Sequence, residues 1–328
     1  MNNKINGSYQ IGVIRNMDIR AYKKDISGLG FRMLACAFII YGVQIIAQDL
    51  ALRINEEWAT DINNLLAVTM LSQYVVGFPI AFLIMRDGVD MHAIEKRKMK
   101  PGHFFVAFAM GYMLLMAGNI IGLIVTYLIG LLKGEAVFNS LDAIVGETNI
   151  WITAIYTVLC APVFEELLFR KMICNRVIKY GQGMAIMLSG LMFGLFHGNF
   201  NQFFYAFFIG CFFAFIYVKT GKIQYTIGLH MMVNFIGSVV GGLFLQYVDF
   251  EHLTMSAVII AMFFVIFVYG IAIAGFVLLL LNHSKLKADE GIIRIDKDRR
   301  SEVMIVNVGM ILYGLFFIIM MDYQAFFG

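Results

Sequence analysis

The chain has 328 residues, of which 60% are hydrophobic and only 14% are charged, and its mean hydropathy is +0.79. About a quarter of the residues in a soluble domain are charged, so these values exclude an ordinary soluble protein, and the apolar content with only three prolines excludes a disordered one. The net charge of +3 is too small to indicate nucleic-acid binding. The composition predicts an integral membrane protein.

Nine apolar runs of span length predict an all-α polytopic transmembrane helix bundle of eight or nine spans. They lie at 30–48, 64–85, 103–132, 150–169, 183–197, 202–218, 223–246, 256–281 and 303–321. The fifth and sixth are short. The predicted organisation is a polar segment 1–29, N-terminal helices 30–149, a core 150–246, and C-terminal helices with a basic loop, 247–328.

The basic residues test this map, because they collect on the cytoplasmic side of a membrane. In the nine-span arrangement, 23 of the 25 lysines and arginines fall on one side. Only Arg53 and Lys133 fall on the other, beside acids such as Glu56 and Asp142. We therefore expect a multi-pass protein with a cytoplasmic N-terminus, in a bacterial plasma membrane.

The acids that the loops and tails do not hold are Glu165 and Glu166, near the end of the fourth span. His197, His230 and Asn234 also fall inside spans. An ionised side chain near the middle of a bilayer costs roughly 2.5–3.5 kcal/mol on insertion scales, so such residues usually line a polar cavity and have a function.

Helix geometry places these residues at similar depths. Counted from the polar turn 180–183, Glu166 and His197 both lie about 20 Å along their helices, at a rise of 1.5 Å per residue. His230 and Asn234 lie roughly 12 and 18 Å along the seventh span by the same rise. Three spans therefore bring two carboxylates, two imidazoles and an amide to one layer.

The spacing of these residues indicates roles. Glu166 and Arg170 are four residues apart, as in an ion pair along a helix, whereas Glu165 points about 100° away and is left as the better base. His230 and Asn234 are also four apart, and an imidazole beside an amide can form an oxyanion hole. The set suits acyl hydrolysis by an activated water.

Three motifs contain these residues: E-E-x-x-x-R at 165–170, F-x-x-x-H at 193–197 and H-x-x-x-N at 230–234. In this order, on successive spans, they resemble the CPBP or Abi family, which includes CAAX prenyl endopeptidases and bacteriocin-processing enzymes. The resemblance covers roughly residues 150–245.

The resemblance implies an intramembrane glutamate-dependent endopeptidase. Glu165 and His197 would activate water, His230 and Asn234 would stabilise the oxyanion, and Glu166 with Arg170 would hold the site in shape. The substrate would be a membrane-associated peptide or protein, either prenylated or of the pheromone or bacteriocin type.

Three alternatives remain. Glu165, His197 and His230 are possible zinc ligands, but no helix carries an H-E-x-x-H pair and the adjacent glutamates point apart, so we expect no cofactor. A non-catalytic scaffold, such as an immunity or sensor-regulating protein, would have no need for costly intramembrane charges. A transporter would need a polar path across both halves of the membrane.

Three small-xxx-small pairs predict close contacts between helices: Gly118/Gly122, Gly190/Gly194 and Gly237/Gly241. The second pair would let the fifth span approach its neighbours near His197. The oligomeric state does not follow from these pairs.

Overall fold

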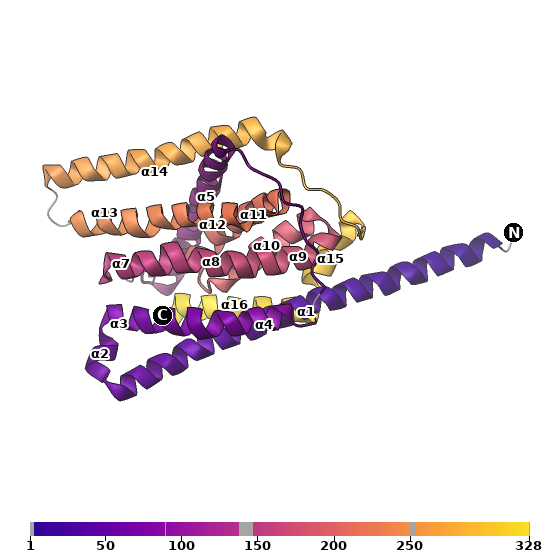
Figure 1. Ribbon diagram of the computed structural model, residues 1–328, viewed down its shortest axis with the longest axis horizontal. Coiled ribbons are helices and arrows are strands. Elements are labelled where there is room, and N and C mark those ends of the chain that lie inside the picture. Colours follow the sequence, from indigo (N-terminus) through magenta and orange to yellow (C-terminus); the bar gives the residue numbers. More distant parts are fainter. Residues whose placement is uncertain (1–2, 89, 138–146, 249–253, 328) are drawn as a thin grey trace.

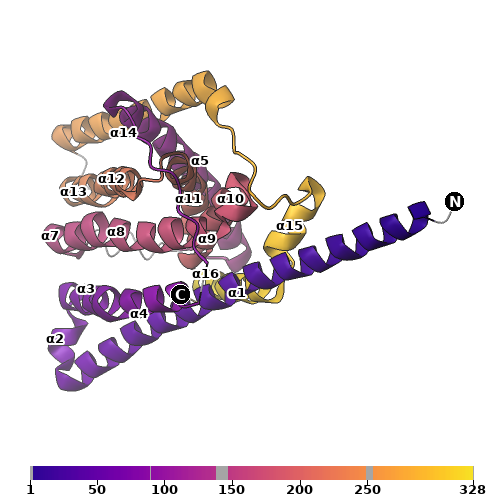
Figure 2. The same cartoon turned by 45° about the vertical axis from the view of Figure 1, so that its right-hand side comes forward.

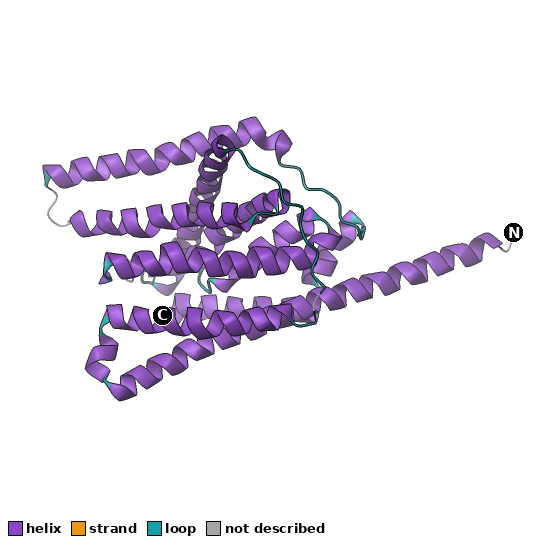
Figure 3. Ribbon diagram, in the orientation of Figure 1, coloured by secondary structure: helices purple, strands orange, loops and turns teal. Residues whose placement is uncertain are grey.

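The computed structural model describes residues 3–88, 90–137, 147–248 and 254–327, and every regular element within these ranges is a helix (Figure 1, Figure 3). Eight helices in the described chain are long and apolar enough to cross a membrane, which confirms the all-α polytopic prediction. They cover Ile19–Ile54, Ile62–Arg86, Pro101–Lys133, Ile150–Tyr180, Phe200–Thr220, Ile223–Tyr247, Met255–Lys285 and Val308–Phe327. Asp142, predicted in an external loop, lies outside the described residues.

Several of these spans are built from more than one helical element. The α-helices are α1 Asn3–Ile54, α2 Glu56–Thr60, α3 Ile62–Leu71, α4 Phe78–Arg86, α5 Pro101–Lys133, α7 Ile150–Thr153, α8 Ala161–Glu165, α9 Asn175–Val177, α10 Gln182–Phe196, α11 Phe200–Thr220, α12 Ile223–Asn234, α13 Gly241–Tyr247, α14 Met255–Asn282, α15 Lys297–Ile305 and α16 Val308–Phe327. Single-turn 3₁₀ segments lie at Ile178–Tyr180 and His283–Lys285, and π-helical segments lie at Ser72–Gly77, Ala154–Cys160, Glu166–Cys174 and Phe235–Val240.

The predicted fifth span is the short helix α10, which is not long enough to cross a membrane by itself. Its 15 residues extend about 22 Å at 1.5 Å per residue, less than the roughly 30 Å of a hydrocarbon core. The helix ends because Gly198 adopts a left-handed conformation with φ of +66°, and the Asn199 side chain then caps α11. The nine predicted spans are therefore eight long helices and this short one.

Helix α1 begins at Asn3 and continues from the predicted polar segment 1–29 into the first predicted span. The helix extends well beyond the bundle (Figure 1). Within the bundle, Asp25 forms ion pairs of 2.9 Å with Arg176 and 3.0 Å with Lys179. In the turned view of Figure 2, α15 lies beside α1, where Lys23 and Glu302 are 3.2 Å apart. A change in polarity along the sequence does not by itself end a helix.

Two loops cross the end of the bundle at which α10 begins and α11 ends. In the first loop, residues 90–100, the N–H of Arg97 donates to the carbonyl of Thr220 (2.7 Å). In the second, residues 286–296, the N–H of Ile293 donates to the carbonyl of Lys179 (2.9 Å). Both are drawn in teal in Figure 3. They cover the end of the bundle that carries the basic loops.

The glycine pairs on α5 and α10 make the predicted close contacts. A Cβ on Gly118 would lie 2.5 Å from the Cα of Tyr205 in α11, and one on Gly190 would lie 2.3 Å from the Sγ of Cys211 in the same helix. The third pair is different, because a Cβ on Gly237 would have no neighbour within 4 Å in the described chain. Helix α11 is therefore held by close backbone contact with both α5 and α10.

We expect Gly190→Ala to lower the free energy of unfolding by about 1–3 kcal/mol, because the added methyl group overlaps Cys211 and its backbone. Gly237→Ala is the matched control and is expected not to destabilise, since its methyl group meets no neighbour. Equilibrium unfolding in detergent micelles measures both. Equal stability of the two variants would contradict the contact between α10 and α11.

Candidate active site

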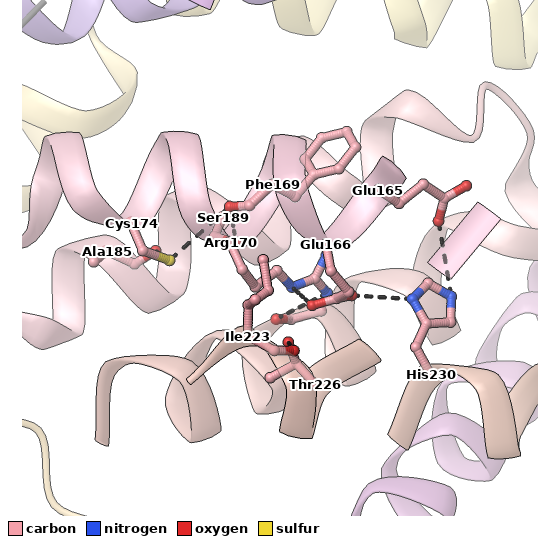
Figure 4. A network of polar contacts seen from close by, with 11 residues as sticks. Glu165, Glu166, Phe169, Arg170, Cys174, Ala185, Ser189, Ile223, Thr226 and His230 are labelled. Atoms are coloured by element: carbon pink, nitrogen blue, oxygen red, sulfur yellow. Dashed lines mark hydrogen bonds and ion pairs between the residues drawn. The ribbon is translucent and has the colours of Figure 1, made fainter. Parts of the chain in front are cut away.

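A buried ion pair, Glu166–Arg170, lies at the bottom of the site. The Arg170 Nε lies 3.2 Å from the Glu166 Oε2, and both side chains are completely inaccessible to solvent. Both residues lie in the π-helical segment Glu166–Cys174, whose i→i+5 hydrogen bonds widen the turn, so the angles expected for a regular α-helix do not apply. The predicted pairing of residues four apart nevertheless holds. Figure 4 shows the pair between two helices.

The Arg170 guanidinium is surrounded by groups from other helices. It lies 4.3 Å from the centroid of the Phe193 ring in α10, and its Nη2 lies 3.5 Å from the carbonyl of Gly210 in α11. The Phe193 ring also packs edge-on against both His197 and His230, with centroids 4.8 and 5.9 Å apart. The phenylalanine of the F-x-x-x-H motif therefore contacts the Arg170 guanidinium and the imidazoles of His197 and His230. The sequence did not reveal this role.

His230 lies between the two glutamates (Figure 4). Its Nδ1 is 3.0 Å from the Glu166 Oε1, and its Nε2 is 3.7 Å from the Glu165 Oε2. Arg170 pairs with Glu166, as predicted, and Glu165 faces the other nitrogen of the imidazole. The two adjacent carboxylates therefore have different partners, and the Glu165 side chain keeps 19% of its surface accessible, whereas Glu166 keeps none.

A cavity of about 300 Å³ lies beside this cluster. Glu165, His197, His230 and Asn234 all line it. Glu166 and Arg170 are not among its lining residues and lie behind the cavity wall. The structure therefore brings together all six predicted residues, four at the cavity surface and two supporting them.

The local structure around His197 determines which of its nitrogens carries a proton. His197 follows the last residue of α10, and its Nδ1 lies 2.9 Å from the carbonyl of Phe193. A carbonyl oxygen can only accept a hydrogen bond, so Nδ1 is the donor, and Nε2 is the acceptor when the ring is neutral. The bond satisfies one of the carbonyls left unpaired at a helix C-terminus.

Asn234 is held by the span that also carries the glutamates. Its Nδ2 donates to the carbonyl of Thr157 in the π-helical segment Ala154–Cys160, at 2.7 Å. An amide nitrogen has two N–H groups, so this bond leaves a second donor on the same atom. Asn234 thus adjoins the cavity from α12 with its side-chain orientation set by the facing helix.

The candidate zinc ligands Glu165, His197 and His230 all line the cavity, and the expectation that they bind no cofactor stays a prediction. Within the described chain, no group of three or more His, Cys, Asp or Glu side chains is placed to hold one metal ion. The Arg170 guanidinium next to Glu166 also disfavours a second cation there.

The cavity also contains neutral polar side chains that the sequence analysis did not single out, among them Gln44, Gln73 and Tyr156. Gln44 belongs to α1 and Gln73 to the π-helical segment Ser72–Gly77, both outside the predicted core. A glutamine within an apolar run is the only signal that the sequence offered for either.

Comparison with known proteins supports the resemblance over part of the chain. The family described as "Type II CAAX prenyl endopeptidase Rce1-like" matches residues 147–236, which contain all three motifs. "Putative membrane peptidase YdiL" of Bacillus subtilis (strain 168) is 31% identical over 77 residues, which are 23% of this chain and 32% of that protein. No solved structure matches significantly. The resemblance to CPBP or Abi proteins is thus confirmed for this segment, whereas the boundaries of the four predicted domains stay predictions.

We expect Arg170→Met to lower the free energy of unfolding by about 3–5 kcal/mol, because it leaves the buried Glu166 carboxylate without its cation. The double variant Glu166→Gln/Arg170→Met removes both charges and is expected to recover part of the loss. Unfolding in detergent micelles measures these differences.

Arg97→Met is the control for this pair, because Arg97 lies in an exposed ion pair with Glu95. Its loss is expected to leave the free energy of unfolding without a measurable change. A double variant as unstable as Arg170→Met alone would contradict the assignment of the loss to an uncompensated charge.

Proposed function

We propose that this chain is an intramembrane endopeptidase that cleaves a peptide bond with a water molecule activated by Glu165 and His197. The observation that carries the proposal is that Glu165, His197, His230 and Asn234 line one and the same cavity. All four residues belong to the segment that resembles CAAX prenyl endopeptidases. A base and hydrogen-bond donors that meet in one cavity are the elements that acyl hydrolysis requires.

In this mechanism, water occupies the cavity between Glu165 and the Nε2 of His197. One of these groups accepts a proton as the water oxygen bonds to the carbonyl carbon of the substrate. The His197 Nδ1 is held as a donor by the Phe193 carbonyl, so the free ring nitrogen is a base. The C–N bond then breaks, and the proton passes to the nitrogen of the departing amine.

His230 and Asn234 would stabilise the oxyanion that forms on the carbonyl oxygen. Glu166 accepts from the His230 Nδ1, which directs the Nε2 toward Glu165 and the cavity. With a proton on each ring nitrogen, His230 would donate from Nδ1 to Glu166 and from Nε2 to the oxyanion. A carbonyl placed beside Glu165 and His230 would then lie within reach of the base and of the donor at once. In this proposal Glu166 and Arg170 are positioning residues, because they act through His230, and no metal takes part.

The proposed substrate is a membrane-associated peptide or protein. A prenylated peptide fits the family description that matches, and a pheromone- or bacteriocin-type peptide is the second substrate class. The substrate would reach the cavity from the cytoplasm or sideways from the lipid. The cytoplasmic N-terminus and the bacterial plasma membrane remain part of the proposal.

We expect Glu165→Gln and His197→Ala each to slow cleavage by about 100- to 10,000-fold, the usual contribution of a general base. The measurement compares the N-termini of membrane-associated peptides in cells with the wild-type and variant proteins. His103→Ala, an exposed histidine at the start of α5, is the control and should leave the products unchanged. Unchanged products with normally inserted Glu165→Gln protein would contradict the catalytic proposal and favour a scaffold.

A chelator tests the metal-free mechanism. Incubation of the purified protein with a zinc chelator is expected to leave its cleavage rate unchanged, because Glu165 and His197 supply the base. Loss of the rate with chelator, and its recovery with added zinc, would contradict this mechanism.

A further inference from the structure

One wall of the cavity consists of neutral polar groups from three helical segments. The Oε1 of Gln73 accepts hydrogen bonds from the Gln44 Nε2 at 2.8 Å and from the Tyr156 hydroxyl at 3.0 Å. All three side chains line the same 300 Å³ cavity as Glu165 and His197. Gln44 and Gln73 lie outside the segment 147–236 that resembles CAAX prenyl endopeptidases.

A role in joining helices does not by itself account for this cluster. The Gln48 Nε2 donates to the Thr69 Oγ1 at 2.9 Å, and this bond links α1 to α3 about one helical turn away from Gln44 and Gln73. Gln48 and Thr69 are not among the residues that line the cavity. The spans Ile19–Ile54 and Ile62–Arg86 therefore carry one polar pair away from the cavity and another at its surface.

The chemistry of the cluster suits a peptide main chain. A peptide that enters the cavity gives up most of the water bound to its N–H and C=O groups, so these groups need hydrogen-bond partners in the protein. The Gln73 oxygen is already engaged by two donors, but its amide nitrogen carries two N–H groups for which a peptide carbonyl is an acceptor. The Gln44 oxygen is in turn an acceptor for a peptide N–H. Neutral amides match a neutral main chain better than a charged headgroup or a terminal carboxylate.

We propose that Gln44 and Gln73, the latter held by the Tyr156 hydroxyl, bind the main chain of the substrate beside the scissile bond. The N-terminal helices would then determine which bond is brought to Glu165, while the segment that resembles CAAX prenyl endopeptidases carries out the hydrolysis. This inference rests on the proposed endopeptidase function.

The test compares Gln73→Leu and Tyr156→Phe with the matched control Gln48→Leu, in the full-length protein in its native membrane. The cleavage products are the peptides whose N-termini are detected in wild-type cells and are absent from Glu165→Gln cells. Gln73→Leu is expected to slow formation of these products about tenfold, which corresponds to the roughly 1.4 kcal/mol of one hydrogen bond. The slowing should be unequal among products, because each substrate depends differently on the lost contact. Gln48→Leu should match the wild type.

Tyr156→Phe keeps the ring and removes only the hydroxyl, so it separates binding from folding. It should change the proportions of the products in the same sense as Gln73→Leu, at wild-type stability. Equal product profiles for Gln73→Leu and Gln48→Leu would overturn the inference, and so would a uniform loss that follows the amount of folded protein. If Glu165→Gln removes no product at all, the endopeptidase proposal itself fails, and this inference fails with it.

Discussion

A buried charge in a membrane protein needs a partner, and the Glu166–Arg170 pair meets this need at the centre of the bundle. Both side chains are fully inaccessible, so each is held in place by the penalty of leaving the other uncompensated. The Phe193 ring, the Gly210 carbonyl and the His230 imidazole pack around the pair. Helices α10, α11 and α12 therefore meet around one cation and one carboxylate.

This arrangement gives two adjacent glutamates different properties. Glu166 is enclosed with a cation and an imidazole, whereas Glu165 keeps part of its surface in the cavity. His230 contacts both, so the buried pair sets the orientation of a ring that reaches the cavity.

Departures from regular helix geometry lie next to the proposed catalytic groups. The π-helical segments Ala154–Cys160 and Glu166–Cys174 flank α8, and α10 stops at Phe196, so that His197 stands at a helix end instead of within a span. Such irregular backbone is tolerated at membrane depth where it lines a cavity or is buried in protein. The close contact of Gly190 with Cys211 keeps α10 and α11 together despite the short helix.

The sequence by itself determined that the chain crosses the membrane many times, and it identified the six charged or polar residues that meet at the site. It could do so because an ionisable group in an apolar run is costly and therefore rarely present without a function. The length of α10 and the start of α1 could not be predicted from the sequence, since apolar content does not show at which residue a helix begins or ends. Only the tertiary structure decided that His230 lies between the two glutamates and that Gln44 and Gln73 line the cavity. A neutral amide is far less costly in a span than a charge, so its role depends on which helix faces it, and only the packing of the helices determines that.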